Sequence, residues 1–111
     1  MSQIETQYDM FLTSLNETIP NVDVNLMLKI MYLERRLPDV APHVEIEIEL
    51  KPGTNRVKKN EQIKSKYGFQ TSHLGEHDLF AVGQMSMDLV AELAKNSDIE
   101  KISGIATPAS Y

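Results

Sequence analysis

The chain has 111 residues, a formal net charge of −5 and a pI near 5.1. This length suits a single domain with a modest core, and the hydrophobic share of 41% is typical of a folded chain rather than a disordered one. The acidic balance argues against nucleic acid or an anionic membrane as the main partner, because both attract a positive surface. The sequence contains no cysteine, which excludes disulfides, thiolate metal ligands and a thiol nucleophile.

The N-terminal segment MSQIETQYDMF lacks the basic start and the continuous apolar core of a secretory signal. The longest apolar region, 26–33, is interrupted by Lys29 and is too short to span a bilayer. We therefore expect a cytoplasmic protein with no membrane partner.

Residues 1–38 are predicted to form two helices, the second of which stops at Pro38. The first helix, around Gln3–Leu15, places its apolar side chains on one stripe, whereas the second, about Val24–Leu37, has a wide apolar arc. We interpret the pair as a helical hairpin extension that packs on the domain or on a second copy of the chain. A partner-binding arm is the less favoured alternative.

Val44–Leu50 shows the clearest strand pattern, because apolar and acidic side chains alternate strictly along it. The apolar set should face a core, while Glu45, Glu47 and Glu49 should face away from it. Like charges on one face repel, so neighbouring cations or a positively charged partner should relieve this acidic row. Paired carboxylates can perform acid–base chemistry, but no cleft is implied here, and a solvated face is the favoured interpretation.

A turn with Thr54 or Asn55 as the capping residue leads into a predicted helix over Arg56–Lys66, which Gly68 ends. The helix is rich in lysine and arginine, yet it has almost no interleaved aromatic side chains. A solvated helix face is therefore favoured over a nucleic-acid surface.

Phe69–Gly75 and Leu79–Met85 are predicted to be two strands joined by a tight turn. His73 and His77 are four residues apart, a spacing that suits a metal on a helix but loses that meaning on a hairpin. A weak surface metal site with the acidic residues of the turn is the lesser alternative. We expect no metal site and no cofactor.

The last stretch begins with Ser86, which is placed to cap a helix whose apolar residues recur at helical spacing from Leu89. A polar turn follows, and a strand pattern starts at Ile99. The tail 106–111 has no periodicity, and Pro108 cannot donate to a sheet ladder. We therefore expect the tail to run extended and exposed.

The predicted order from residue 43 onward is strand, helix, strand, strand, helix, strand. Two right-handed crossovers fold this order into a four-stranded antiparallel sheet with both helices on one face, which is the ferredoxin-like βαββαβ plait. The expected fold class is therefore α+β, with the plait over 43–111 preceded by the extension 1–38. One sheet face stays open unless residues 1–38 cover it, and a binding function would lie there. No spacing assembles a nucleophile, a base and an orienting group, so we expect no catalytic residues and no enzyme.

In the last third of the chain a strand, Phe80–Gly83, leads to the apolar helical segment Leu89–Leu93. A polar turn follows, and then Ile99–Ile102 with two β-branched residues three apart. Through these motifs the block 44–111 resembles the propeptide-like inhibitors of subtilisin-type serine proteases, which share the plait. The resemblance extends to the C-terminus, where Tyr111 falls where such propeptides end.

The resemblance implies two contacts with a protease. The sheet would pack against two surface helices of the enzyme. The tail residues would lie in the active-site cleft like a cleaved product: Pro108, Ala109, Ser110 and Tyr111. The last of them would enter the primary specificity pocket.

The chain departs from the family pattern at Ser103 and Gly104, where the family usually has acidic residues that cap helices of the protease. Four acidic residues of this chain are expected to supply that contact instead: Glu45, Glu47, Glu49 and Glu100. The resemblance thus implies a non-enzymatic inhibitor or folding chaperone of a subtilisin-type serine protease. The alternative is a ferredoxin-like assembly or regulatory domain that acts as a homodimer through the N-terminal helices or the open sheet.

Overall fold

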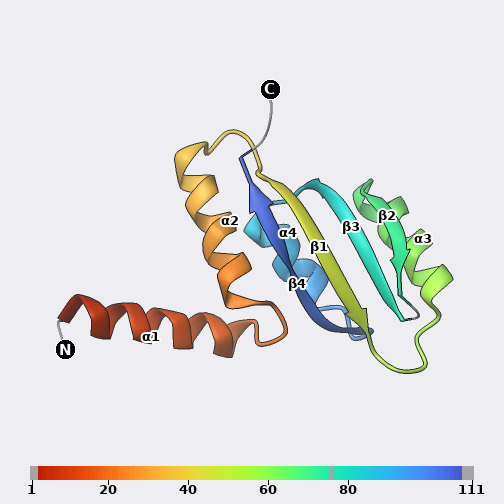
Figure 1. Ribbon diagram of the computed structural model, residues 1–111, viewed down its shortest axis with the longest axis horizontal. Helices are drawn as coiled ribbons and strands as arrows, with labels where there is room; N and C mark the ends of the chain where they lie inside the picture. Colours follow the sequence, from red (N-terminus) through yellow and green to blue (C-terminus); the bar gives the residue numbers. More distant parts are fainter. Residues whose placement is uncertain (1–2, 76, 109–111) are drawn as a thin grey trace.

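The computed structural model of the protein describes residues 3–75 and 77–108, and its path is drawn in Figure 1. The helices are α1 (Gln3–Thr18), α2 (Val24–Arg36), α3 (Arg56–Tyr67) and α4 (Met87–Ala94). The strands are β1 (His43–Leu50), β2 (Gln70–Leu74), β3 (Asp78–Gln84) and β4 (Ile99–Thr107). The predicted α+β class and the four-stranded antiparallel sheet are confirmed.

The sheet has the strand order β2-β3-β1-β4, so the alternating strand β1 lies in its middle. Val44, Ile46 and Ile48 are completely buried on one face of β1. They lie beside Gly83, Ala81 and Leu79 of β3 in register. The predicted apolar face of β1 is therefore the centre of the core, and its glutamates point to the opposite face.

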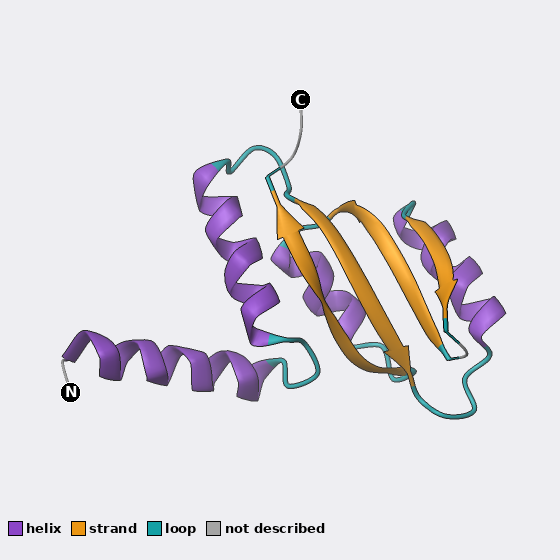
Figure 2. Ribbon diagram, viewed as in Figure 1, coloured by secondary structure: helices purple, strands orange, loops and turns teal. Residues whose placement is uncertain are grey.

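Helices α3 and α4 cover the buried face, and both lie behind the sheet in Figure 2. Local capping begins and ends them as the sequence indicated. The Asn55 side chain accepts a hydrogen bond from the Lys58 N–H, and the Ser86 hydroxyl accepts one from the Leu89 N–H. Gly68 ends α3 in the left-handed conformation, with a φ of 74°.

Helix α2 belongs to the same hydrophobic core, because Leu26, Met27, Ile30 and Leu33 are buried in one cluster with the sheet residues. The segment before α2 is hydrogen-bonded to the outer edge of β4. The Asp23 N–H donates to the Ile102 carbonyl at 2.9 Å, and the Ile102 N–H donates back to the Asn21 carbonyl at 2.8 Å. The core therefore crosses the boundary that the sequence predicted between 1–38 and 43–111.

Helix α1 does not form the side-by-side hairpin with α2 that the sequence led us to expect. Figure 1 shows α1 pointing away from the rest of the chain, with only its C-terminal end near α2. Leu15 and Ile19, at this end, are partly buried against the core. The bonds between residues 21–23 and β4 fix the start of α2, and local helix patterns do not reveal them.

Gly104 of β4 lies against the backbone of β1. A Cβ atom at this position would overlap the Glu45 carbonyl oxygen and would lie 2.9 Å from the Ile46 Cα. Only glycine permits this approach without a shift of the β1–β4 ladder.

We predict that Gly104→Ala lowers the free energy of unfolding by about 2 kcal/mol or more, because the central ladder must move. The control is Gly53→Ala, since Gly53 has a φ of 85° but nothing within 4 Å of an added Cβ. That variant should lose only the conformational cost of about 1 kcal/mol. Urea unfolding followed by circular dichroism measures both changes, and equal losses would contradict the packing argument.

Candidate functional site

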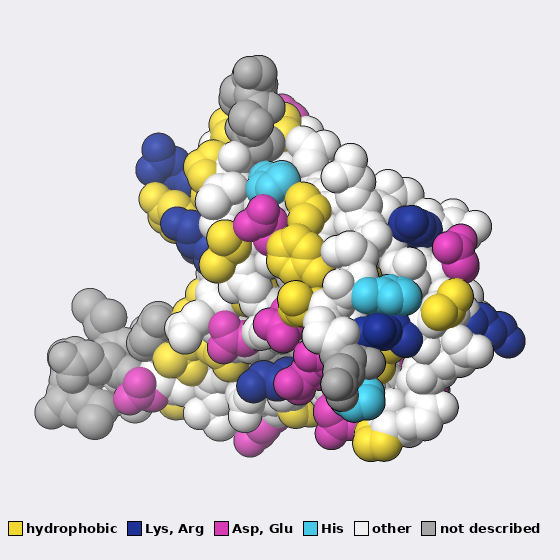
Figure 3. Space-filling model, turned by 45° about the vertical axis from the view of Figure 1, so that its right-hand side comes forward, with side chains coloured by type: hydrophobic (Ala, Val, Ile, Leu, Met, Phe, Trp, Pro, Cys, Tyr) yellow, Lys and Arg dark blue, Asp and Glu magenta, His cyan; other side chains and the backbone are white. Residues whose placement is uncertain are grey.

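The candidate site is the sheet face opposite the helices, which no element of the described chain covers. The register places Phe80, Val82 and Ile105 on this face. Phe80 lies opposite Glu47 of β1, and Glu45 lies between Val82 and Ile105. Phe80 and Val82 are half-buried, whereas the side chain of Ile105 is 59% exposed. Figure 3 shows apolar side chains gathered on this surface with acidic ones beside them.

The acidic row has little compensating charge within the described chain. Glu45 and Glu47 are half-buried and Glu49 is exposed. The nearest titratable partner of Glu45 is His43, with 3.9 Å between Nε2 and Oε1. Lys101 lies opposite Glu49 in register, yet no described lysine or arginine forms a salt bridge with the row. This face therefore presents a central acidic row on β1, with apolar side chains of β3 on one side of it and Ile105 of β4 on the other.

The other predicted binding residues lie apart from the centre of this face. Glu100 is exposed at the irregularity where the β1–β4 register shifts. Pro108 is exposed just after β4, as expected for the start of the tail. Ala109, Ser110 and Tyr111 lie outside the described residues.

The sequence patterns did not predict the apolar side chains on the open sheet face. Residues 79–82 are all apolar, so the alternation that identified the two faces of β1 is absent from β3. The continuous apolar run 79–82 could have revealed them, because such a run indicates a strand with apolar side chains on both faces.

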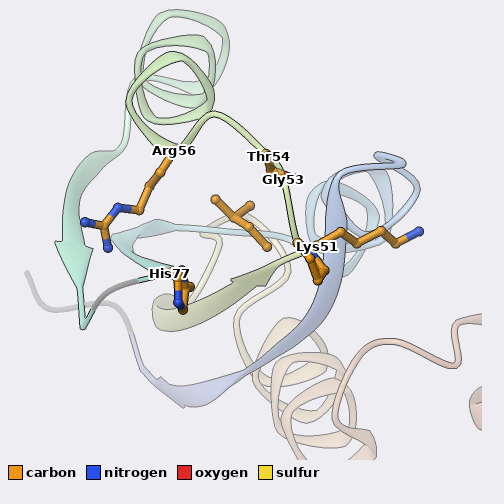
Figure 4. Close-up of a pocket in the computed structure, with 7 residues that line it drawn as sticks. Lys51, Gly53, Thr54, Arg56 and His77 are labelled. Atoms are coloured by element: carbon orange, nitrogen blue, oxygen red, sulfur yellow. The ribbon is translucent and has the colours of Figure 1, made fainter.

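A second concave feature, of about 320 Å³, lies beside the turn that follows β1 and is lined partly by Lys51, Arg56 and His77. Figure 4 shows that Lys51 points away from Arg56. The Arg56 guanidinium instead donates to the Gly75 carbonyl at 2.8 Å. The charged groups of Lys51 and Arg56 do not converge on one point. We therefore interpret this hollow as a gap between loops.

The predicted lesser alternative of a metal at the β2–β3 turn finds no support in the geometry. His73 lies on β2, while His77 lies in the turn before β3. Among the residues that the structure describes, no group of three histidine, aspartate or glutamate side chains is placed to hold an ion. Glu76, which the alternative included, lies outside the described residues.

The basic residues of α3 make structural contacts. Lys59 is buried, and its Nζ lies 2.8 Å from the Asp98 carboxylate and 3.3 Å from the Asn96 side-chain oxygen. Lys66 and Glu92 form an exposed pair at 3.1 Å. The hydrogen bond that the Lys66 ammonium donates to the Glu92 carboxylate, with a further contribution from Tyr67, raises the pKa of Lys66 above its ordinary value of 10.5. Both pairs tie α3 to the α4–β4 region.

We predict that Asp98→Asn lowers the free energy of unfolding by about 1–2 kcal/mol, because it leaves the buried Lys59 ammonium without a counter-charge. The loss stays below that of a fully buried pair, since the Asp98 side chain is 47% exposed. Glu92→Gln, which breaks the exposed pair, should produce no measurable change. A larger loss for Glu92→Gln than for Asp98→Asn in urea unfolding would reverse this assignment.

Comparison with known proteins found no relative. No family model, no curated protein and no solved structure matches the chain. No helix in the described part of the chain is long and apolar enough to cross a membrane. The candidate site therefore rests on the geometry and chemistry of this chain alone.

Proposed function

We propose that residues 43–111 are a ferredoxin-like plait that works as a protein-binding domain. The support is topological. The element order β1-α3-β2-β3-α4-β4 and the sheet order β2-β3-β1-β4 place β1 and β3 in the centre, with both connecting helices on one face. Two crossovers of the same hand produce this arrangement. A layer of helices on one side leaves the other side of the sheet for a partner.

The proposed function is that of a non-enzymatic inhibitor or folding chaperone of a subtilisin-type serine protease. The observation that carries it is the uncovered sheet face, on which Phe80, Val82 and Ile105 lie on the two sides of the acidic row of β1. Residues 1–38 do not cover this face in the described structure. A cytoplasmic location stays part of this proposal.

Binding would use two contacts because neither is sufficient alone. A tail of four residues binds weakly, since ordering a flexible segment costs about 1–2 kcal/mol per residue. The sheet face would supply the larger part of an interface of roughly 1,600 Å². The acidic row would lie near helix N-termini or basic groups of the protease, where negative charge is favourable. The tail from Pro108 onward would add to the cleft as an extended strand.

We predict that Ile105→Lys raises the inhibition constant against a broad-specificity subtilisin by roughly tenfold or more, because it places a charge where the proposed contact has an exposed apolar side chain. Val57→Lys is the matched control, since Val57 is 61% exposed but lies on α3, on the opposite side of the sheet. Both exposed positions leave the core intact. Equal inhibition by the two variants in an enzyme titration would reject the sheet face as the contact.

We also predict that deleting residues 108–111 removes active-site blockade while the fold is kept, because Pro108 is exposed and follows the last strand. Hydrolysis of a small chromogenic substrate reports the blockade, and circular dichroism reports the fold. Full inhibition by the shortened chain would exclude a product-like tail.

The second candidate is a homo-oligomeric assembly or regulatory domain that buries the open sheet face between copies. The same exposed Ile105 favours it, because an apolar side chain on a sheet face is equally suited to a symmetric partner. Size-exclusion chromatography with light scattering of the wild type and Ile105→Lys distinguishes the two candidates. Dissociation of an oligomer by that substitution would favour assembly over inhibition.

A further inference from the structure

A groove of about 320 Å³ between the C-terminal part of α2 and Pro108, which follows β4, combines apolar and basic side chains. Tyr32, which is 52% exposed, lies at its centre with Leu37 beside it. Lys29 and Arg36 flank the Tyr32 ring, at 5.6 Å and 5.9 Å from its centroid. Neither cation forms a salt bridge with a carboxylate of the described chain. The groove is therefore an apolar centre between two uncompensated positive charges.

The exposed face of α1 has the complementary character. Every charged residue of this helix is acidic. Met10 is 67% exposed and lies in a shallow hollow together with Asp9 and Glu17. Neither carboxylate has a cationic partner in the described chain. This face is an apolar side chain between two uncompensated negative charges.

The spacing of the two sets of charges agrees. Asp9 and Glu17 are eight residues apart along α1, which corresponds to about 12 Å of helix rise. Lys29 and Arg36 are seven residues apart along α2, or about 10.5 Å. Two helices packed side by side can therefore bring both carboxylates to both cations at once, with Met10 against the Tyr32 ring.

We propose that α1 of one copy binds in the α2 groove of a second copy, and that the exchange is reciprocal. A two-fold dimer then contains the α1–α2 contact twice, which doubles the buried surface. The occupant cannot be α1 of the same chain, because α1 leads into the N-terminal end of α2 and points away from the rest of the chain (Figure 1).

This dimer goes beyond the proposed inhibitor function. Pro108 lines the groove as well as beginning the proposed tail, so the dimer is tested by its mass and the inhibitor by substrate hydrolysis, and each proposal can fail without the other. It also differs from an assembly through the open sheet, because its contacts are the charged side chains of α1 and α2.

The experiment measures the mass of the full chain by light scattering over a dilution series. Wild type should be a dimer that dissociates on dilution. Asp9→Lys/Glu17→Lys and Lys29→Glu/Arg36→Glu should each raise the dissociation constant roughly tenfold or more, because like charges now face each other. An equimolar mixture of the two variants should restore the dimer, since both contacts in the heterodimer again pair opposite charges.

The matched control for Lys29→Glu/Arg36→Glu is Lys58→Glu/Lys64→Glu on α3, which changes the net charge by the same amount at exposed positions outside the groove and should dimerise as wild type does. Met10→Lys is an independent variant that should dissociate the dimer without loss of packing in the single chain. A wild type that stays monomeric, variants that stay dimeric, or a mixture that stays monomeric would each overturn the proposal.

Discussion

The strict alternation of β1 in the middle of the sheet is the constraint on which the structure depends. Three of its side chains, Val44, Ile46 and Ile48, are completely buried, and each such burial contributes about 1.5–3 kcal/mol. Because the side-chain period of a strand is two, the same register that buries these residues brings the glutamates to the other face. A one-residue slip would place three carboxylates in the core, so the register has no competitor.

This constraint makes the sheet one-sided. Helices α2, α3 and α4 share one core behind it, whereas the acidic row prevents a second layer of the same chain from burying the front cheaply. The apolar side chains of β3 and β4 on that front face are then left beside unpaired carboxylates. A partner with basic groups or helix N-termini satisfies both features, which is why the open face carries the proposed function.

Local sequence signals predicted most of the helices and strands, but they did not predict how some of them pack. Asn55, Gly68 and Ser86 act where the sequence predicted, because a cap depends on backbone groups within a few residues. The expected helical hairpin was wrong, because α1 lies near α2 only at its C-terminal end, and the segment 21–23 between the helices bonds to β4, some eighty residues later in the chain. The apolar side chains of the candidate site were missed for a related reason, since Val82 of β3 and Ile105 of β4 come to the same face only because both pair with Glu45.

The sequence by itself determined the α+β class, the order of the elements and the two faces of β1, because periods of two and 3.6 residues and capping residues act over short stretches of chain. Only the tertiary structure decided that the β1 backbone lies so close to Gly104 that no side chain fits there, and that α2 is part of the core. It also decided that α1 points away from the rest of the chain. These features arise from contacts between residues far apart in the sequence. Such contacts are selected by how the finished layers pack, which no local pattern encodes.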